Sequence, residues 1–124
     1  MQNNADYQQT FENYRWKLFE IMAIEAELAA IRRQIDEGIA SRDQYDPQWE
    51  NELTAELETA KAQIKLVEDL IASIPDSPKM MPCKLFLRLH YLAGYNMTDT
   101  AVMMNVSLST LRRIKERSIE FLSS

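Results

Sequence analysis

Four basic side chains fall within six consecutive residues near the end of the sequence: Arg112, Arg113, Lys115 and Arg117. Ammonium and guanidinium groups bind anions, and the planar arginine fork can grip a phosphate or the edge of a guanine through two hydrogen bonds. Glu116 is the only acidic residue among them. The cluster predicts contact with a polyanion, and the alternative is a solvated helix face without a partner.

The charge of the chain is divided unevenly along its length. Residues 79–124 hold seven basic and three acidic side chains, a net charge of +4, whereas residues 1–78 hold seven basic and 16 acidic ones, a net charge of −9. Salt screens charges from one another beyond about 10 Å, so the net charge of a region matters more than the total. The sequence therefore predicts that a polyanion would meet the C-terminal region.

The N-terminal region has the apolar spacing of a long helix. Apolar residues recur every three or four positions between Tyr7 and Ile39, which predicts a helix over about residues 6–39. Gly38 is the expected stop, because glycine readily takes the left-handed conformation at a helix end. The polar stretch over residues 41–46 then separates this helix from the next.

A second helix is predicted over residues 47–74. Asp46 can cap its free backbone N–H groups, and Pro47 suits the first helical position. Its apolar residues form two interleaved seven-residue repeats: Leu53, Leu57, Ala60, Ile64, Val67, Ile71 and Ile74. This repeat predicts a coiled coil, and the short connection predicts that the two helices form an antiparallel hairpin.

The first helix is apolar over a wider face than one partner needs, because Ile24 and Ile31 lie beside its main stripe. This width predicts a homodimer formed through the N-terminal helices. The alternative is a monomeric hairpin that also packs on the C-terminal domain.

Three prolines fall within residues 75–82, where they end the coiled coil and mark a linker. The predicted organisation is therefore an acidic coiled-coil hairpin over residues 1–74, a proline-rich linker over 75–82, and a small domain over 83–124. The fold class is all-α.

The C-terminal domain is predicted to contain three helices. The first runs from Pro82 to about Ala93 and ends before Gly94, and the second runs from Thr98, as its cap, to Met104. Asn105 then occupies a tight turn, because asparagine tolerates a positive φ.

Ser107 caps the third helix, which runs from Leu108 to about Leu122. Ala101 is small enough to let the second and third helices approach closely, and Leu111 and Ile114 point inward. This spacing predicts a helix–turn–helix, whose last helix fits the major groove of DNA.

Residues 85–122 resemble the sigma-70 region 4 type of helix–turn–helix, and the overall plan is similar to phage and prophage transcription regulators of the ArpU kind. Ser107, Thr110 and Leu111 match the start of the family's recognition helix, and Arg112, Arg113 and Arg117 match its basic positions. The chain departs from the family at Thr100, where isoleucine is usual, and at Asn105, where glycine is usual. The resemblance implies a DNA-binding transcription regulator.

The expected DNA-binding residues share polarity and a position in the C-terminal domain. They are Lys84, Arg88, Thr98, Ser107, Ser109, Thr110, Arg112, Arg113, Lys115, Glu116 and Arg117. The expected partners are double-stranded DNA and a second copy of the chain, with RNA polymerase as a further candidate. The competing interpretation is a protein-interaction or inhibitor module that binds RNA polymerase or another host protein through the acidic hairpin or the C-terminal domain.

No catalytic constellation, metal-ligand cluster or cofactor motif is present in the sequence, so we expect neither an enzyme nor a cofactor. Cys83 is the only cysteine and His90 the only histidine. No apolar run approaches the ~20 residues that span a bilayer. We expect no membrane contact and a cytoplasmic location.

Overall fold

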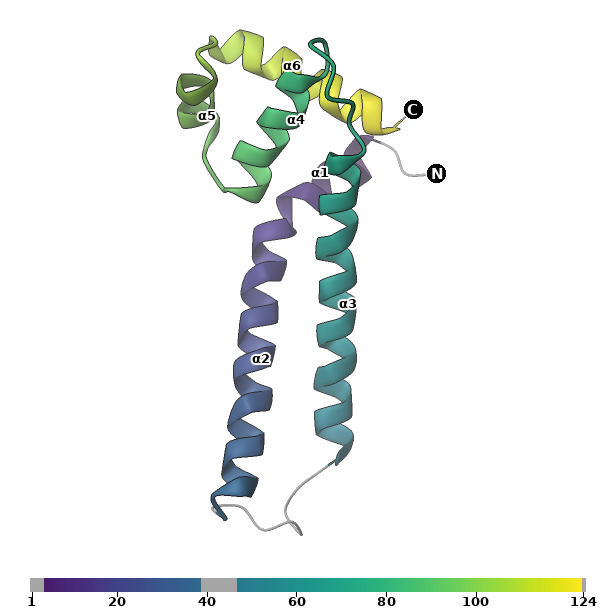
Figure 1. The fold of residues 1–124 in the computed structure, drawn as a ribbon, viewed down its shortest axis with the longest axis vertical. Helices are drawn as coiled ribbons and strands as arrows, with labels where there is room; N and C mark the ends of the chain where they lie inside the picture. Colours follow the sequence, from purple (N-terminus) through teal and green to yellow (C-terminus); the bar gives the residue numbers. More distant parts are fainter. Residues whose placement is uncertain (1–3, 39–46, 124) are drawn as a thin grey trace. The chain divides into compact units, whose positions relative to one another are not determined.

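The computed structural model describes residues 4–38 and 47–123, and in these ranges the chain is all-α with no strand (Figure 1). The elements are α1 (Asn4–Glu12), α2 (Tyr14–Asp36), α3 (Pro47–Ala72), α4 (Met81–Leu87), the π-helical turn η2 (Arg88–Leu92), α5 (Met97–Met104) and α6 (Leu108–Ser123).

The chain forms two compact units that differ from the predicted division at residues 75–82. The larger unit comprises Met1–Arg15 and Lys65–Ser124, and the smaller unit comprises Trp16–Ile64. The described residues 4–15 thus belong with the C-terminal helices, although they were expected in the hairpin.

The predicted single helix over residues 6–39 is wrong, because the structure contains two helices that meet at Asn13. Asparagine is a poor helix residue, since its side chain competes for backbone hydrogen bonds. The second of these helices ends at Asp36, and Gly38 follows with φ of +72°. The role of Gly38 as a stop is confirmed.

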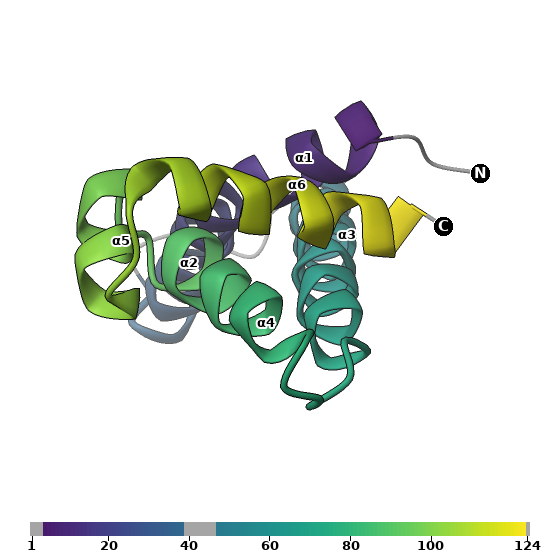
Figure 2. The same ribbon diagram turned by 90° about the horizontal axis from the view of Figure 1, so that it is seen from above.

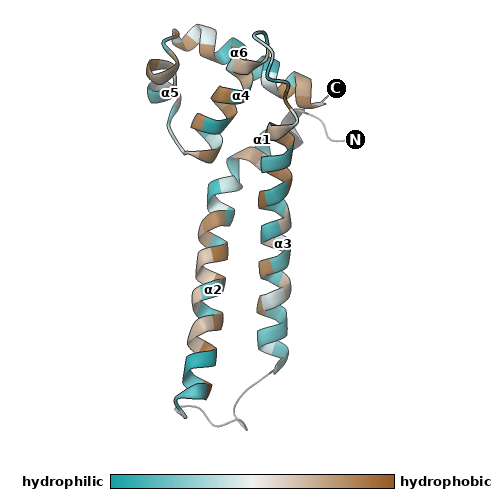
Figure 3. Cartoon of the chain, in the orientation of Figure 1, coloured by the Kyte–Doolittle hydropathy of each residue, from teal (hydrophilic) through white to brown (hydrophobic). Residues whose placement is uncertain are grey.

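In the smaller unit, α2 and α3 pack against each other through Ile24, Leu28, Ile31 and Leu53. Arg32 Nε lies 3.6 Å from Glu50 Oε1, so the end of α2 is beside the start of α3 and the helices are antiparallel. Figure 3 shows hydrophobic and hydrophilic residues alternating along both helices. Because Ile24 and Ile31 face α3, they give no reason to expect a second neighbour.

The start of α3 at Pro47 is confirmed, while Asp46 and the polar stretch over residues 41–46 lie outside the described residues. Six of the seven predicted seam residues are buried, and Leu57 is half-buried. The helix ends at Ala72, so Ile74 is buried in the segment that follows it.

The larger unit has a core built by α4, η2, α6 and α1. Phe86, Leu87 and Leu111 are fully buried in it. The ring of Phe11 in α1 lies 5.4 Å from that of Tyr91, and α1 also packs against α6 (Figure 2). The N-terminal helix is therefore part of the support of α6.

Two helix starts in this unit differ from the prediction. The first C-terminal helix begins at Met81, with Pro82 in its first turn, and becomes π-helical from Arg88 before Gly94 turns the chain with φ of +84°. The next helix is capped by Asn96, whose side-chain oxygen accepts the N–H of Asp99 at 2.7 Å. Thr98, the expected cap, lies inside the helix, because the asparagine two residues earlier takes the extended conformation that a cap requires.

Candidate nucleic-acid interface

Helix α6 is strongly two-sided. Its buried face consists of Leu111, Ile114, Ser118, Ile119 and Leu122. The opposite face carries Ser109, Arg112, Arg113, Glu116, Arg117 and Glu120, which are all exposed. Phe121, near the end of the helix, is 37% exposed. Burial of one face fixes the rotation of the helix, and the polar face is therefore held toward solvent.

Ser107 caps the start of α6, as predicted. Its Oγ accepts the N–H of Thr110 at 3.2 Å and donates to Oγ1 of Thr110 at 3.0 Å. Its Oγ also lies 3.1 Å from Oγ of Ser109. These hydroxyls surround the positive end of the helix dipole, where a phosphate is stabilised.

The turn between α5 and α6 is fixed by Asn105, which has φ of 57° and ψ of 46°. Its N–H donates to the carbonyl of Val102 at 3.1 Å, and the N–H of Val106 donates to that of Ala101 at 3.0 Å. Ala101 is buried, so the small side chain lies where the two helices meet. The predicted left-handed turn is confirmed.

Thr100, at a position where the resemblance expects isoleucine, is fully buried. Its hydroxyl donates to the carbonyl of Asn96 at 2.7 Å. The polar group is thereby satisfied inside its own helix, and the buried threonine carries no unpaired donor.

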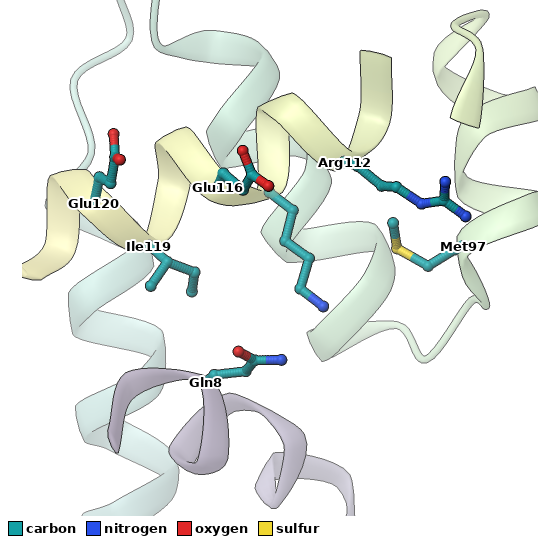
Figure 4. A pocket seen from close by; sticks show the side chains of 7 residues that line it. Gln8, Met97, Arg112, Glu116, Ile119 and Glu120 are labelled. Carbon is teal, nitrogen blue, oxygen red and sulfur yellow. The ribbon is translucent and has the colours of Figure 1, made fainter. Parts of the chain in front are cut away.

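Two hollows flank the polar face of α6. Arg112 and Lys115 border a cavity of about 530 Å³ that is also lined by Gln8 of α1 and Met97 at the start of α5. Figure 4 shows Arg112 extending toward Met97, with Gln8 across from Ile119. Glu116 and Glu120 lie on the same side. This flank therefore combines both signs of charge.

The other flank is apolar. Thr110, Arg113 and Arg117 border a hollow of about 570 Å³. Its other lining residues come from the linker, α4, the end of α5, the turn and α6: Pro78, Met81, Pro82, Leu85, Met104, Val106 and Ile114. None of the four α6 cations has an ion-pair partner among the described residues. Their charge is therefore available to an external anion.

Lys84 does not belong to this surface, although its type and position predicted a phosphate contact. It is only 6% exposed, and its Nζ lies 2.8 Å from Oδ1 of Asp76. The local reason is that Lys84 falls on the buried face of α4, beside Cys83 and Leu87. Its charge is used inside the protein.

The other predicted residues separate into two groups. The α6 residues and its cap lie together at one end of the helix, whereas Arg88 lies in η2 and Thr98 in α5. Both are exposed, but neither lines the two hollows beside α6.

Two residues that shape this surface or its surroundings were not predicted from the sequence. Gln8 lines the first cavity because α1 packs on α6, and Asp76 neutralises Lys84 from within the linker. Helical spacing reveals an apolar face but not the partner of that face, so nothing in the pattern of residues 4–12 pointed to α6.

Neither a family model, nor a curated protein, nor a solved structure matches this chain. The resemblance to sigma-70 region 4 thus stays a prediction. Over residues 4–38 and 47–123, no group of three or more acidic, histidine or cysteine side chains could hold a metal ion. The helices in these ranges are also too short or too polar to cross a membrane.

Proposed function

We propose that the chain is a DNA-binding transcription regulator, in which α5 and α6 form a helix–turn–helix and α6 enters the major groove of double-stranded DNA. The observation that carries this proposal is the exposed, unpaired cluster of Arg112, Arg113 and Arg117 on the outer face of a capped helix. Such a helix after a short turn is how this class of motif presents side chains to base edges.

The residues on α6 have different expected roles. Ser107, Ser109 and Thr110, together with the free N–H groups of the first turn, contact phosphate at the start of the helix. Arg112 and Arg113 are the candidates for guanine recognition, since they lie one turn further in. Lys115 and Arg117 supply the salt-dependent attraction to the backbone.

Glu116 and Glu120 limit the basic surface. Both are exposed: Glu116 lies between Lys115 and Arg117, and Glu120 follows the basic cluster. Carboxylates repel phosphate but accept the amino group of cytosine, so Glu116 favours sequence-dependent over purely electrostatic binding. This agrees with the modest net charge of +4 over residues 79–124.

The acidic helices fit a separate role. In the proposal, α2 and α3 are an antiparallel coiled-coil hairpin through which two copies associate, so that one dimer reads two half-sites. The resemblance further implies a phage or prophage regulator that acts in the cytoplasm.

The apolar hollow beside Arg113 and Arg117 favours a second candidate function, namely a protein-interaction module. Met81 and Leu85 on its wall are 43% and 42% exposed. Exposed apolar surface of this kind is typical of a protein contact. RNA polymerase is the candidate partner in that interpretation.

A salt titration separates the two functions. The full chain is first used to select bound sequences from a random DNA pool, and affinity for the selected duplex is then measured against salt. The proposal predicts affinity that falls steeply, about 10³-fold or more between 50 and 200 mM salt if six or more phosphates are contacted. If no duplex is enriched and none binds at low salt, the protein-interaction module replaces the proposal.

A further inference from the structure

Helix α2 has a second apolar face that α3 does not cover. Trp16 is 73% exposed, Phe19 57% and Met22 65%. Ala23 and Ala26 are also exposed, and Ala30 is half-buried. Large exposed apolar side chains grouped on one helix face mark an interaction site far more often than scattered ones do.

This face is distinct from the one that packs on α3. The buried contacts of α2 in the smaller unit are made by Ile24, Leu28 and Ile31. At 100° per residue, Ala26 lies about 160° around the helix from Leu28. The helix is thus apolar on two opposite sides, with charged residues such as Glu20 and Glu25 between them.

We propose that this second face binds the same face of another copy of the chain, with the two α2 helices antiparallel. The proposal deepens the dimerisation in the proposed function and rests on that part alone, not on DNA binding.

The spacing of the face is the first argument for a second copy. Its central positions are Trp16, Phe19, Ala23, Ala26, Ala30 and Arg33. The intervals are three, four, three, four and three residues, which is a coiled-coil seam and reads the same in both directions. An antiparallel copy therefore meets it position by position.

Side-chain size is the second argument. In the antiparallel register, Phe19 lies opposite Ala30 of the second copy, and Ala23 lies opposite Ala26 of the second copy. The large Phe19 thus meets a small residue at each end of the interface, and alanine meets alanine at the centre. A parallel copy would stack Trp16 on Trp16 and Phe19 on Phe19 at one end and leave only alanines toward the other, so one end would be crowded and the other loosely packed.

A cation–π contact is the third argument. Antiparallel pairing brings Arg33, which is exposed, over Trp16 of the second copy, where a cation–π contact forms.

The area is sufficient for a modest dimer. Trp16 and Phe19 offer roughly 300 Å² per copy, given that an aromatic side chain buries 150–250 Å². With Met22 and the alanines, the pair buries about 1,000 Å² in total, near the lower limit for a specific interface. We therefore expect a reversible dimer whose population depends on concentration.

Sedimentation equilibrium of the full chain, without DNA, tests the surface. We expect a wild-type dimer at tens of micromolar and an Ala26→Glu variant that stays monomeric with unchanged helix content. Ala62→Glu is the matched control, because Ala62 is exposed on α3 outside this face, and it should dimerise like the wild type. Phe19→Gln serves as a second variant should Ala26→Glu lose helix content.

A wild-type chain that remains monomeric overturns the proposal and leaves the face to a different protein. A dimer that tolerates both α2 variants also overturns it, because the contact would then lie elsewhere. Since no DNA is present, either result leaves the proposed DNA binding untouched.

Disulfide crosslinking tests the antiparallel register. Chains that carry Ala23→Cys are mixed with chains that carry Ala26→Cys. In both variants the buried Cys83 is replaced by Ala, so that each chain has one cysteine. The antiparallel register predicts that most crosslinks join one chain of each kind. Crosslinks that join like chains contradict it and indicate parallel helices.

Discussion

Nζ of Lys84 lies 2.8 Å from Oδ1 of Asp76, so the linker carboxylate neutralises a lysine that is almost wholly buried in α4. The hydrogen bond from Lys84, and then its charge, hold the pKa of Asp76 below its usual 3.8. The proline-rich segment is therefore tied to the first turn of the C-terminal helices, and it does more than separate two parts of the chain.

Replacing Asp76 with Asn should lower the melting temperature, because the buried ammonium group of Lys84 loses its counter-charge. A depressed pKa gives stability that is present above the usual pKa and lost as pH falls through the lowered one. The difference between wild type and Asp76→Asn in thermal unfolding should thus be present near pH 6 and shrink below about pH 4. A Lys84→Met change added to Asp76→Asn should recover part of the loss, and no recovery would show that the pair is not the cause.

Asn96 and Thr98 provide a direct comparison of two candidate caps. Because Asn96 accepts the N–H of Asp99, Asn96→Ala should reduce the free energy of unfolding by about 1 kcal/mol. Thr98→Ala, at the exposed second residue of the helix, should change it by less than about 0.5 kcal/mol. Urea unfolding measures the free energy of unfolding of both variants. A larger loss for Thr98→Ala than for Asn96→Ala would show that Thr98 is the cap, as the sequence predicted.

Asn105 should respond to substitution according to its left-handed backbone. Asn105→Gly should leave stability unchanged or raise it, whereas Asn105→Ala should cost about 1 kcal/mol, because alanine lacks the short polar side chain that lets asparagine tolerate the left-handed conformation. Asn51→Ala, at an exposed site in α3, is the matched control and should be neutral or slightly stabilising. Equal effects of Gly and Ala at position 105 would contradict the strained turn.

Tyr91 has a buried hydroxyl without a hydrogen-bond partner among the described residues. Tyr91→Phe keeps the ring contacts with Phe11 and Phe86, so the free energy of unfolding should stay the same or rise by up to about 1 kcal/mol. A loss of stability would show that the Tyr91 hydroxyl has a hydrogen-bond partner in solution. Tyr95→Phe, at a ring that is 43% exposed, is the control.

The same residue predicts alkaline sensitivity. Burial, with a smaller contribution from Glu12, raises the pKa of Tyr91 to about 12 from 10.0. Above pH 10 the unfolded chain loses this proton first, so stability falls as pH rises toward 12. Urea unfolding across this pH range should show that the free energy of unfolding falls less steeply for Tyr91→Phe than for the wild type. Identical slopes would show that Tyr91 does not cause the alkaline loss of stability.

Much of the fold follows from local patterns. The seam of α3 with its start at Pro47, the stop at Gly38, the turn at Asn105 and the cap at Ser107 all depend on neighbouring residues, and all are as predicted. Such features need no knowledge of distant contacts, because backbone conformation and spacing decide them.

Features that depend on distant partners were not predictable. Phe11 has the same helical phase as Tyr14 and Leu18, so the sequence did not reveal that α1 packs on α6. Lys84 resembles a surface lysine until its burial beside Asp76 is known. Trp16 lies on an exposed face of α2, and helical spacing alone does not show which apolar residues stay uncovered.

The most direct test of the account is the affinity of the Arg112→Ala, Arg113→Ala double variant for the duplex selected by the wild-type chain. Both arginines are exposed on α6 and without ion pairs among the described residues, so folding should be preserved by circular dichroism. Lys61→Ala with Lys65→Ala removes the same charge from exposed sites on α3 and serves as the matched control. The account predicts that the α6 variant loses at least about 30-fold in affinity, at 1–3 kcal/mol for each base contact, while the control stays near wild type. Wild-type affinity in the α6 variant would contradict it.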